Sequence, residues 1–335
     1  MNANKRDIWV DNVKVIACIL VVLGHFFQSM VKSNLMVGTF AYNYFEDTIY
    51  YFHVPLFFIC SGYLYQKYSS VNKFETWINS VIKKIIALGI PYFVFTFITW
   101  VLKKVFASSV NGEIGGILDT FFVHPTSPYW YLYILFIFFV ITVTTKTKRM
   151  QLIMFGLAIV VRGLSELGFA TGLYFIDKSM ENWVWFVLGM LISYNVMFLP
   201  DIKLGIVLFV VFLTGSYVAE IGYIPFPFVS FALTLLACCS IIGIMKTIFE
   251  DGMQKKNWSF GTRYTMPIFL MHTLFAAPLR SVLLKVGITN LVAHVALGLV
   301  ISFAGPIIAM LIMERIKPLD FVVYPNRYLK YKGRK

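Results

Sequence analysis

Long apolar runs recur along the whole chain and constrain its fold more than any other feature. Each run is close to twenty residues, the length that an α-helix needs to cross a hydrocarbon core about 30 Å thick. Membrane barrels would give short alternating segments instead. We therefore predict an all-α, polytopic integral membrane protein, with residues 1–335 forming a single membrane-embedded domain. The ten predicted spans are residues 13–31, 48–66, 82–102, 128–145, 150–168, 182–199, 203–219, 226–248, 264–284 and 290–314.

Composition excludes the main soluble classes. Hydrophobic residues make up 59% of the chain and charged residues 13%, whereas a soluble domain is about 25% charged. A single soluble core cannot bury so much apolar surface, which excludes a soluble enzyme, a disordered chain and a secreted disulfide scaffold. The four cysteines lie inside apolar runs, so we interpret them as small buried hydrophobes rather than a disulfide set or a zinc site. They are Cys18, Cys60, Cys238 and Cys239.

The basic residues behind the net charge of +13 are distributed as a membrane topology requires. Basic residues form short clusters between apolar runs rather than a stripe on a soluble face, so we expect no nucleic-acid partner. If the N-terminus is cytoplasmic, 22 of the 29 Lys and Arg residues lie inside, as the positive-inside rule requires. We predict a plasma-membrane protein with both termini cytoplasmic and a solvated basic tail over about 315–335. The seven outside residues are Lys32, Lys103, Lys104, Arg162, Lys178, Arg280 and Lys285.

Two ionisable residues of the first span share one helical stripe. Lys14 and His25 are eleven positions apart, which is close to three whole turns and about 16 Å along the axis. Asp11 precedes Lys14 by three positions and can pair with it. Ionisable groups inside a membrane are costly and mark functional sites, so we expect a path from the cytoplasm to a buried imidazole. The alternatives are that Lys14 only anchors the helix and that His25 makes a structural bond between helices.

Polar residues also interrupt the second and ninth spans. His53 lies near the outer end of the second span, and Ser61 lies eight residues deeper beside Gly62. We interpret Ser61 and Gly62 as a small pair for close helix packing, with a nucleophilic serine as the alternative. In the ninth span Pro267 permits a kink shortly before His272. This histidine lines a cavity or makes a hydrogen bond between helices.

The fifth span carries a charged pair near its outer end. Arg162 and Glu166 are spaced i, i+4 and form either a simple ion pair or part of a polar outer vestibule. A metal site would need three or four converging ligands. His25, His53 and His272 come from separate spans without short spacing, so we expect no metal.

Four segments together resemble the acyltransferase 3 family. They cover nearly the whole chain in the family's order and with its number of spans. The resemblance implies a multipass O-acyltransferase that transfers an acyl group, most commonly acetyl from cytoplasmic acetyl-CoA, to a hydroxyl of a bacterial cell-surface or lipid-linked glycan. The segments are Asp11-x-x-Lys14-x10-His25, His53-x-Pro55 through Ser61-Gly62-Tyr63, Trp130-Tyr131-Leu132, and Tyr264 to His272 with the sequence YTMPIFLMH.

The resemblance implies roles for these residues. His25 would act as general base on the acceptor hydroxyl or as a transient acyl carrier, and Asp11 would orient Lys14. The family often has Arg at the position of Lys14. The cations that would hold the CoA phosphates are Lys14, Lys83, Lys84 and Arg263. The residues expected to line the substrate cavity are His53, Ser61, Trp130, Arg162, Glu166, Tyr264 and His272.

Other functions remain open at this stage. A multipass transporter or flippase for a glycan or small solute would also carry ionisable residues inside its spans, although we find no internal repeat or matched pair of broken helices. A structural membrane protein would leave His25 unexplained. Some family members carry an additional extracytoplasmic domain, which we expect to be absent here. A separate partner would then supply any second transfer step, beside the membrane lipids and the glycan acceptor.

Overall fold

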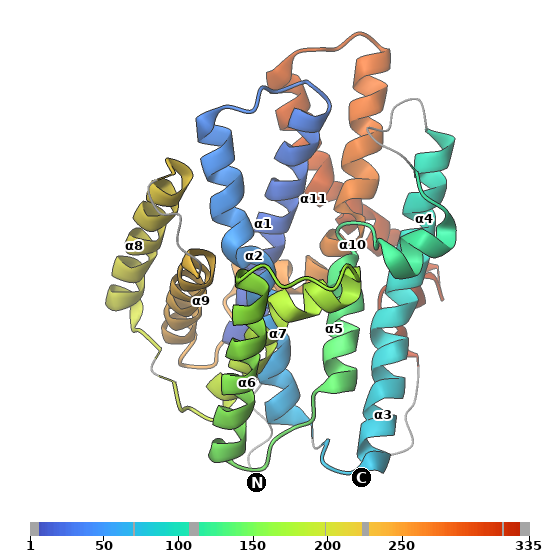
Figure 1. Cartoon of the computed structure of the whole chain (residues 1–335). Coiled ribbons are helices and arrows are strands. Elements are labelled where there is room, and N and C mark those ends of the chain that lie inside the picture. The colour runs from blue at the N-terminus through green and yellow to red at the C-terminus, as the bar shows by residue number, and fades with distance from the viewer. Residues whose placement is uncertain are drawn as a thin grey trace.

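The computed structural model describes residues 7–69, 71–106, 114–197, 199–222, 228–316 and 318–328, which contain helices and no strands (Figure 1). The helices are α1 Ile8–Lys32, α2 Phe40–Tyr68, α3 Phe74–Lys84, α4 Ile90–Val105, α5 Trp130–Ile141, α6 Lys148–Glu166, α7 Tyr174–Ser193, α8 Ile202–Glu220, α9 Val229–Ile248, α10 Lys256–Lys285 and α11 Leu291–Arg315. Two π-turns, Ile85–Gly89 and Asp119–Val123, and two 3-10 turns, η4 Leu319–Val322 and η5 Pro325–Arg327, complete the described elements.

Six helical segments of the described chain are long and apolar enough to cross a membrane. They are α1, the continuous segment Phe74–Val105, α8, α9, α10 and α11. Each of the ten predicted ranges overlaps a helix, so the all-helical fold is confirmed, with six segments as candidate membrane spans. The number of ten spans and the side on which the termini lie stay predictions.

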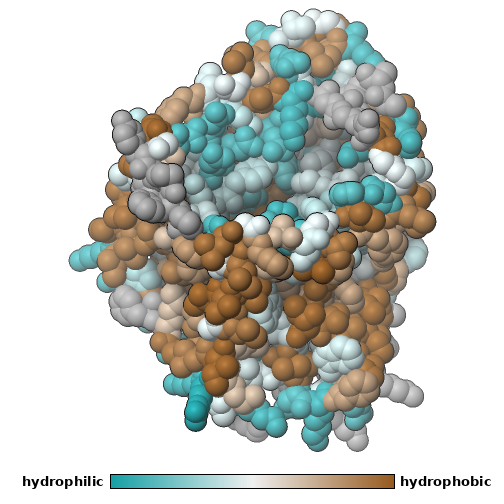
Figure 2. Space-filling model, viewed as in Figure 1, coloured by the Kyte–Doolittle hydropathy of each residue, from teal (hydrophilic) through white to brown (hydrophobic). Residues whose placement is uncertain are grey.

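Apolar side chains on the outer helices face away from the protein. On α6, Ile153 and Val160 are 65% and 59% exposed, and α8 presents Val207 and Val210 in the same way. Such large exposed apolar surfaces are covered by lipid in a membrane protein. Figure 2 shows hydrophobic residues over the lower part of the face in view, below a hollow lined by hydrophilic ones.

Two glycines let α2 and α7 cross in close contact at the centre of the bundle. A Cβ atom on Gly62 would lie 1.9 Å from the carbonyl oxygen of Phe186, and one on Gly189 would lie 1.9 Å from that of Ile59. Both distances are far below contact, so neither position accepts a side chain without separating the helices. The close packing predicted at Gly62 is therefore confirmed. All four cysteines are buried and free, also as predicted.

The span predicted over 128–145 is helical only over α5. The chain becomes extended at Thr142 (φ −107°, ψ 128°) because its threonines take partners outside the helix. The backbone N–H of Thr144 donates to the Val71 carbonyl at 3.2 Å, and the Val71 N–H donates to Thr144 Oγ1 at 2.8 Å. Tyr65 donates its hydroxyl to the Thr142 carbonyl at 2.8 Å. The prediction missed these non-local bonds.

The segment after α11 packs back onto the bundle. Asp320 and Val323 are 5% and 2% exposed, so part of the tail that we predicted to be solvated is buried. Residues 318–319 and 326–328 are exposed, and residues 329–335 lie outside the described part. Burial raises the pKa of Tyr324 to about 12, and this protonated hydroxyl donates to the carbonyl of Arg263 at 3.0 Å. The segment therefore lies at the end of the bundle where α1 begins, beside Lys14.

Candidate functional site

Three cavities follow one another along α1 and α10. The terminal cavity, about 670 Å³, lies where α1 begins; Asp11, Lys14, Ser61, Lys84, Thr265 and Arg327 are among its lining residues. The central cavity, about 270 Å³, lies between α1, α2 and α7; His25, His53, Trp130, Arg162, Lys178 and Trp185 are among its lining residues. The lateral cavity, about 300 Å³, lies between α1, α4 and α10; His25, Lys32, Lys103, Ser127, Pro278 and Arg280 are among its lining residues.

His25 stands between the central and lateral cavities and lines both. Its Nδ1 lies 3.0 Å from Nε2 of His272 on α10. Its Nε2 lies 3.0 Å from the hydroxyl oxygen of Ser127, in the loop before α5. His272 is buried, and its Nδ1 lies 3.0 Å from the carbonyl oxygens of both Ile268 and Phe269.

These contacts assign the protonation of both imidazoles. A carbonyl oxygen only accepts hydrogen bonds, so Nδ1 of His272 carries the proton and its Nε2 is the acceptor. The proton between the two rings therefore belongs to Nδ1 of His25. A neutral His25 then has its lone pair on Nε2, which accepts the hydroxyl hydrogen of Ser127. This is the arrangement of a general base whose tautomer is fixed by a third group.

His53 and Trp130, two of the residues that we expected to line a substrate cavity, both line the central cavity. His53 is buried, its Nδ1 lies 2.8 Å from the Ile49 carbonyl oxygen, and its ring meets that of Tyr50 edge to face with centroids 4.7 Å apart. Within the described chain no group of three or more His, Cys, Asp or Glu residues is placed to hold a metal ion.

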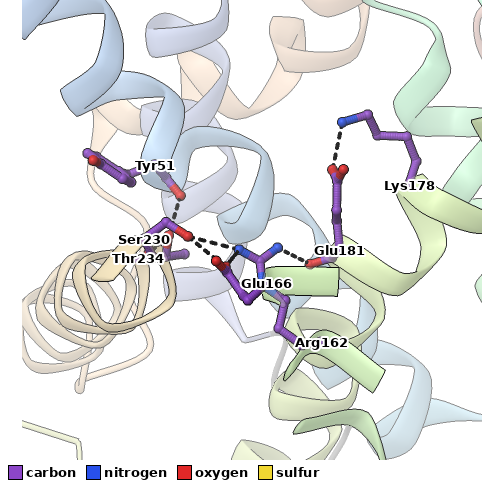
Figure 3. Close-up of polar contacts among 7 residues, drawn as sticks. All are labelled: Tyr51, Arg162, Glu166, Lys178, Glu181, Ser230 and Thr234. Atoms are coloured by element: carbon purple, nitrogen blue, oxygen red, sulfur yellow. Dashed lines mark hydrogen bonds and ion pairs between the residues drawn. The ribbon is translucent and has the colours of Figure 1, made fainter. Parts of the chain in front are cut away.

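Arg162 joins three elements at the wall of the central cavity (Figure 3). Its guanidinium pairs with the Glu166 carboxylate, donates to the Glu181 carbonyl at 2.7 Å and donates to Ser230 Oγ on α9 at 3.1 Å. Lys178 bonds the Glu181 carboxylate at 2.6 Å. Arg162 and Glu166 are thus an ion pair, and Arg162 also lines the central cavity. Glu166, which we expected to line the substrate cavity, is not among the lining residues.

The terminal cavity gathers some of the predicted cations and adds one. Lys14 and Lys84 line it, and Arg327 from η5 lines it too. Lys83 is exposed and is not among the lining residues. Arg263 is 57% exposed and pairs with Glu314 at 2.8 Å, also away from the lining. The sequence did not reveal Arg327, because a lone Arg in a basic tail carries no local signal for folding back.

Three aromatic rings separate the terminal cavity from the central one. Phe57, Tyr131 and Phe269 line both, with ring centroids 5.4 to 5.8 Å apart. We call them the aromatic wall. Ser61 lines the terminal cavity and its Oγ lies 3.1 Å from the Tyr131 hydroxyl. Tyr264 is buried beside the ring of Phe260 and lines none of the three cavities.

Comparison with known proteins supplies the family context. A family model described as an acyltransferase domain matches residues 7–311. Nodulation protein NolL of Sinorhizobium fredii (strain NBRC 101917 / NGR234) is 34% identical over 131 residues, which are 39% of this chain and 34% of that protein. Nodulation protein NolL of Mesorhizobium japonicum (strain LMG 29417 / CECT 9101 / MAFF 303099) is 26% identical over 130 residues, 39% of this chain and 33% of that protein. The matches thus span about a third of these curated relatives, and no solved structure matches the chain.

Proposed function

The chain belongs to the acyltransferase 3 family and is an acyltransferase, and from this premise we propose the reaction that its three cavities carry out. An acyl-CoA, acetyl-CoA in the simplest case, binds in the terminal cavity from the cytoplasm. A glycan hydroxyl enters the central cavity from the other side. The acyl group passes the aromatic wall and is transferred at His25. The protein is thus a membrane O-acyltransferase of cell-surface or lipid-linked glycans.

The observation that carries this proposal is the contact of a hydroxyl with Nε2 of His25, the nitrogen that the assigned tautomer leaves without a proton, at the wall of a cavity. Its contact with Ser127 Oγ, 3.0 Å long, is within the range expected of a base and the proton it abstracts. Ser127 is exposed, so an acceptor hydroxyl can take its place. The same lone pair would serve an acyl carrier, and we assign the role of general base because Nε2 is in contact with a hydroxyl.

The reaction balances around this histidine. Nε2 takes the proton of the acceptor hydroxyl while the oxygen attacks the thioester carbonyl carbon, forming a C–O bond. The C–S bond to CoA breaks, and the departing thiolate takes the proton back from the imidazolium. Nε2 of His272 accepts the hydrogen bond from Nδ1–H of His25 throughout and stabilises the transient positive charge. General base catalysis of this kind contributes about 10²–10⁴-fold in rate.

The terminal cavity fits an anionic, elongated donor. Lys14, Lys84 and Arg327 can hold phosphate oxygens, and the Arg supplies a forked donor that Lys lacks. Asp11 lines the same cavity, where it can orient Lys14. About 16 Å of α1 separate Lys14 from His25, so the acyl end of a bound CoA must extend along α1 toward the aromatic wall.

The central cavity fits a sugar. Tyr51, Trp130 and Trp185 contribute aromatic rings, while Arg162 and Asn182 contribute hydrogen-bonding groups. Aromatic side chains combined with a few fixed polar groups are typical of pockets that bury and orient a small ligand. His53 lines the same cavity.

The experiment compares glycans from a bacterial host that lacks the gene and carries empty vector, wild type or His25→Ala. Base-labile acetyl is measured on surface and lipid-linked glycans at equal amounts of membrane-inserted protein. We expect acetyl above the vector level only with the wild type. Acetyl at the wild-type level with His25→Ala would refute the assigned base, and no acetyl with the wild type would refute acetyl transfer to glycans.

A further inference from the structure

Five of the seven basic residues assigned to the outer side line the two cavities beside His25. Arg162 and Lys178 line the central cavity. Lys32, Lys103 and Arg280 line the lateral cavity. Charges on this side oppose the positive-inside rule, so topology does not explain them. Arg162 and Lys178 pair with Glu166 and Glu181, and the other three cations gather in the lateral cavity beside His25.

The lateral cavity has the electrostatics of an anion site. Its cations come one each from α1, α4 and α10, and its described lining contains no Asp or Glu. Lys103 and Arg280 are partly buried, and Lys32 lines the same cavity. A bound anion would offset the cost of gathering like charges in a partly buried place. Arg280 is held in place, since its guanidinium donates to the Ser29 carbonyl at 2.9 Å and also contacts the Ser29 hydroxyl.

The rest of the lateral cavity is apolar. Leu102, Phe106, Leu274, Ala277 and Pro278 line it together with the cations. On the neighbouring helices Phe97 of α4 and Val282 of α10 are exposed, as side chains that face lipid are. An anion with an apolar chain therefore finds charge inside the cavity and apolar surface beside it.

We propose that the lateral cavity binds the phosphate of a lipid-linked acceptor, with its apolar chain between α4 and α10 and its sugar at His25. This rests on the proposed function and specifies its acceptor as a phosphate-bearing lipid glycan. A phosphate suits a cluster of one Arg and two Lys because it offers several charged oxygens to donors from different directions. His25 and Ser127 line both cavities, so one molecule can occupy the two at once.

The test measures binding, so it does not depend on transfer. Full-length protein in maltoside micelles is titrated with radiolabelled dodecyl phosphate and, separately, with dodecanol. We expect the phosphate to bind at least about tenfold more tightly, because a hydrogen bond to a charged group contributes about that much or more. Equal affinities would overturn the proposal. The probes carry no sugar and no acyl group is transferred, so a failure of the catalytic assignment at His25 would not change this result.

Variants test which cations are responsible. Lys103→Gln with Arg280→Gln should abolish the preference for the phosphate, whereas Arg280→Lys should keep most of it. Lys104→Gln is the matched control, because Lys104 is adjacent in sequence but lies over Trp100. A double variant that folds, by an unchanged thermal midpoint, and keeps the preference would overturn the site. If the double variant does not fold, the single variants Lys103→Gln and Arg280→Gln must each reduce the preference.

A competition arm identifies the source of the phosphate. Dioleoylphosphatidylglycerol brings the same phosphate and apolar chains as any bilayer lipid. If it displaces dodecyl phosphate no better than dodecanol does, the site selects acceptor-like single-chain phosphates, as we expect. If it displaces dodecyl phosphate at equal concentration, the cavity is a site for bilayer lipid and the acceptor assignment is wrong.

Discussion

Nδ1 of His25 lies 3.0 Å from Nε2 of His272, although 247 residues separate them in the sequence. Nδ1 of neutral His272 donates to two backbone carbonyls, so its Nε2 can only accept a hydrogen bond. This contact fixes the tautomer of His25 in which Nδ1 carries the proton and Nε2, which faces the cavity, is the base. His272 is therefore a positioning residue. Its effect should appear in kcat rather than in the KM of either substrate.

Replacing His272 tests this relationship. His272→Leu removes the acceptor for the Nδ1 proton of His25, so kcat should fall by about 10²-fold or more. His272→Gln can still present an acceptor oxygen and should recover part of that loss. Steady-state kinetics on both variants provide the measurement. Leu and Gln variants with equal kcat, or an unchanged kcat in His272→Leu, would show that the contact has only a structural role.

Ser127 occupies the place that we assign to the acceptor hydroxyl. Ser127→Ala should therefore keep kcat within about tenfold of wild type, since the substrate supplies the group that His25 deprotonates. Intact mass measurement after incubation with acetyl-CoA alone should reveal no acetylated protein. An acetyl group on Ser127 would instead identify Ser127 as a covalent carrier, and complete loss of transfer in the alanine variant would show that the substrate hydroxyl cannot take its place.

The cations of the terminal cavity should govern affinity for the donor. Lys14→Gln and Arg327→Gln should each raise the KM for acetyl-CoA by about tenfold or more, because each removes a charged contact to phosphate, and leave the KM for the acceptor unchanged. The matched control is Lys148→Gln, an exposed lysine at the start of α6. Unchanged donor KM in Lys14→Gln and Arg327→Gln would place the CoA phosphates elsewhere.

The aromatic wall should limit the length of the transferred acyl group. Phe269→Ala removes one of its three rings, so the ratio of kcat/KM for butyryl-CoA to that for acetyl-CoA should rise by about tenfold or more, given about 1–3 kcal/mol per methylene in a fitted pocket. Rates with both donors provide the ratio. Phe93→Ala, an exposed ring on α4, is the control. An unchanged ratio in Phe269→Ala would mean that the acyl group takes another path.

The α2–α7 crossing should determine stability. Gly189→Ala would place a methyl group 1.9 Å from the Ile59 carbonyl, which must force the helices apart at a cost of about 1–3 kcal/mol or more. The thermal midpoint of the purified protein should fall. Gly156→Ala on α6 meets nothing within 4 Å and should leave the midpoint unchanged. Equal midpoints for the two variants would contradict the close contact of these helices.

Local sequence signals predicted the helices and part of the site. Twenty-residue apolar runs predicted an all-helical multipass protein, and the family resemblance is confirmed by the match over residues 7–311. The spacing of Lys14 and His25 predicted that they share one face of a helix. In the structure Lys14 lines the terminal cavity and His25 lines the central one. The spacing of two residues within a helix fixes their relative positions along and around its axis. The arrangement of Lys14 and His25 could therefore be predicted without knowing which helices pack beside them.

Residues brought in by chain folding could not be predicted in the same way. Ser127 reaches His25 from a loop about a hundred positions away, and Arg327 reaches the terminal cavity because buried residues of η4 and η5 fold the segment back. Arg263 looked equivalent to Lys14 by composition, yet its partner Glu314 lies 51 positions away. Such partners depend on tertiary contacts, which cannot be predicted from the local pattern of a single sequence.

The most direct test of the account uses sealed vesicles in which all copies of the protein expose the Lys14 end outward. Labelled acetyl-CoA is added outside, and a lipid-linked glycan acceptor is present in the membrane. We predict base-labile acetyl on the acceptor and one free CoA released outside per acetyl transferred, both abolished by His25→Ala. Movement of the acceptor across the membrane without CoA release, or acetyl transfer that persists in His25→Ala, would contradict the account.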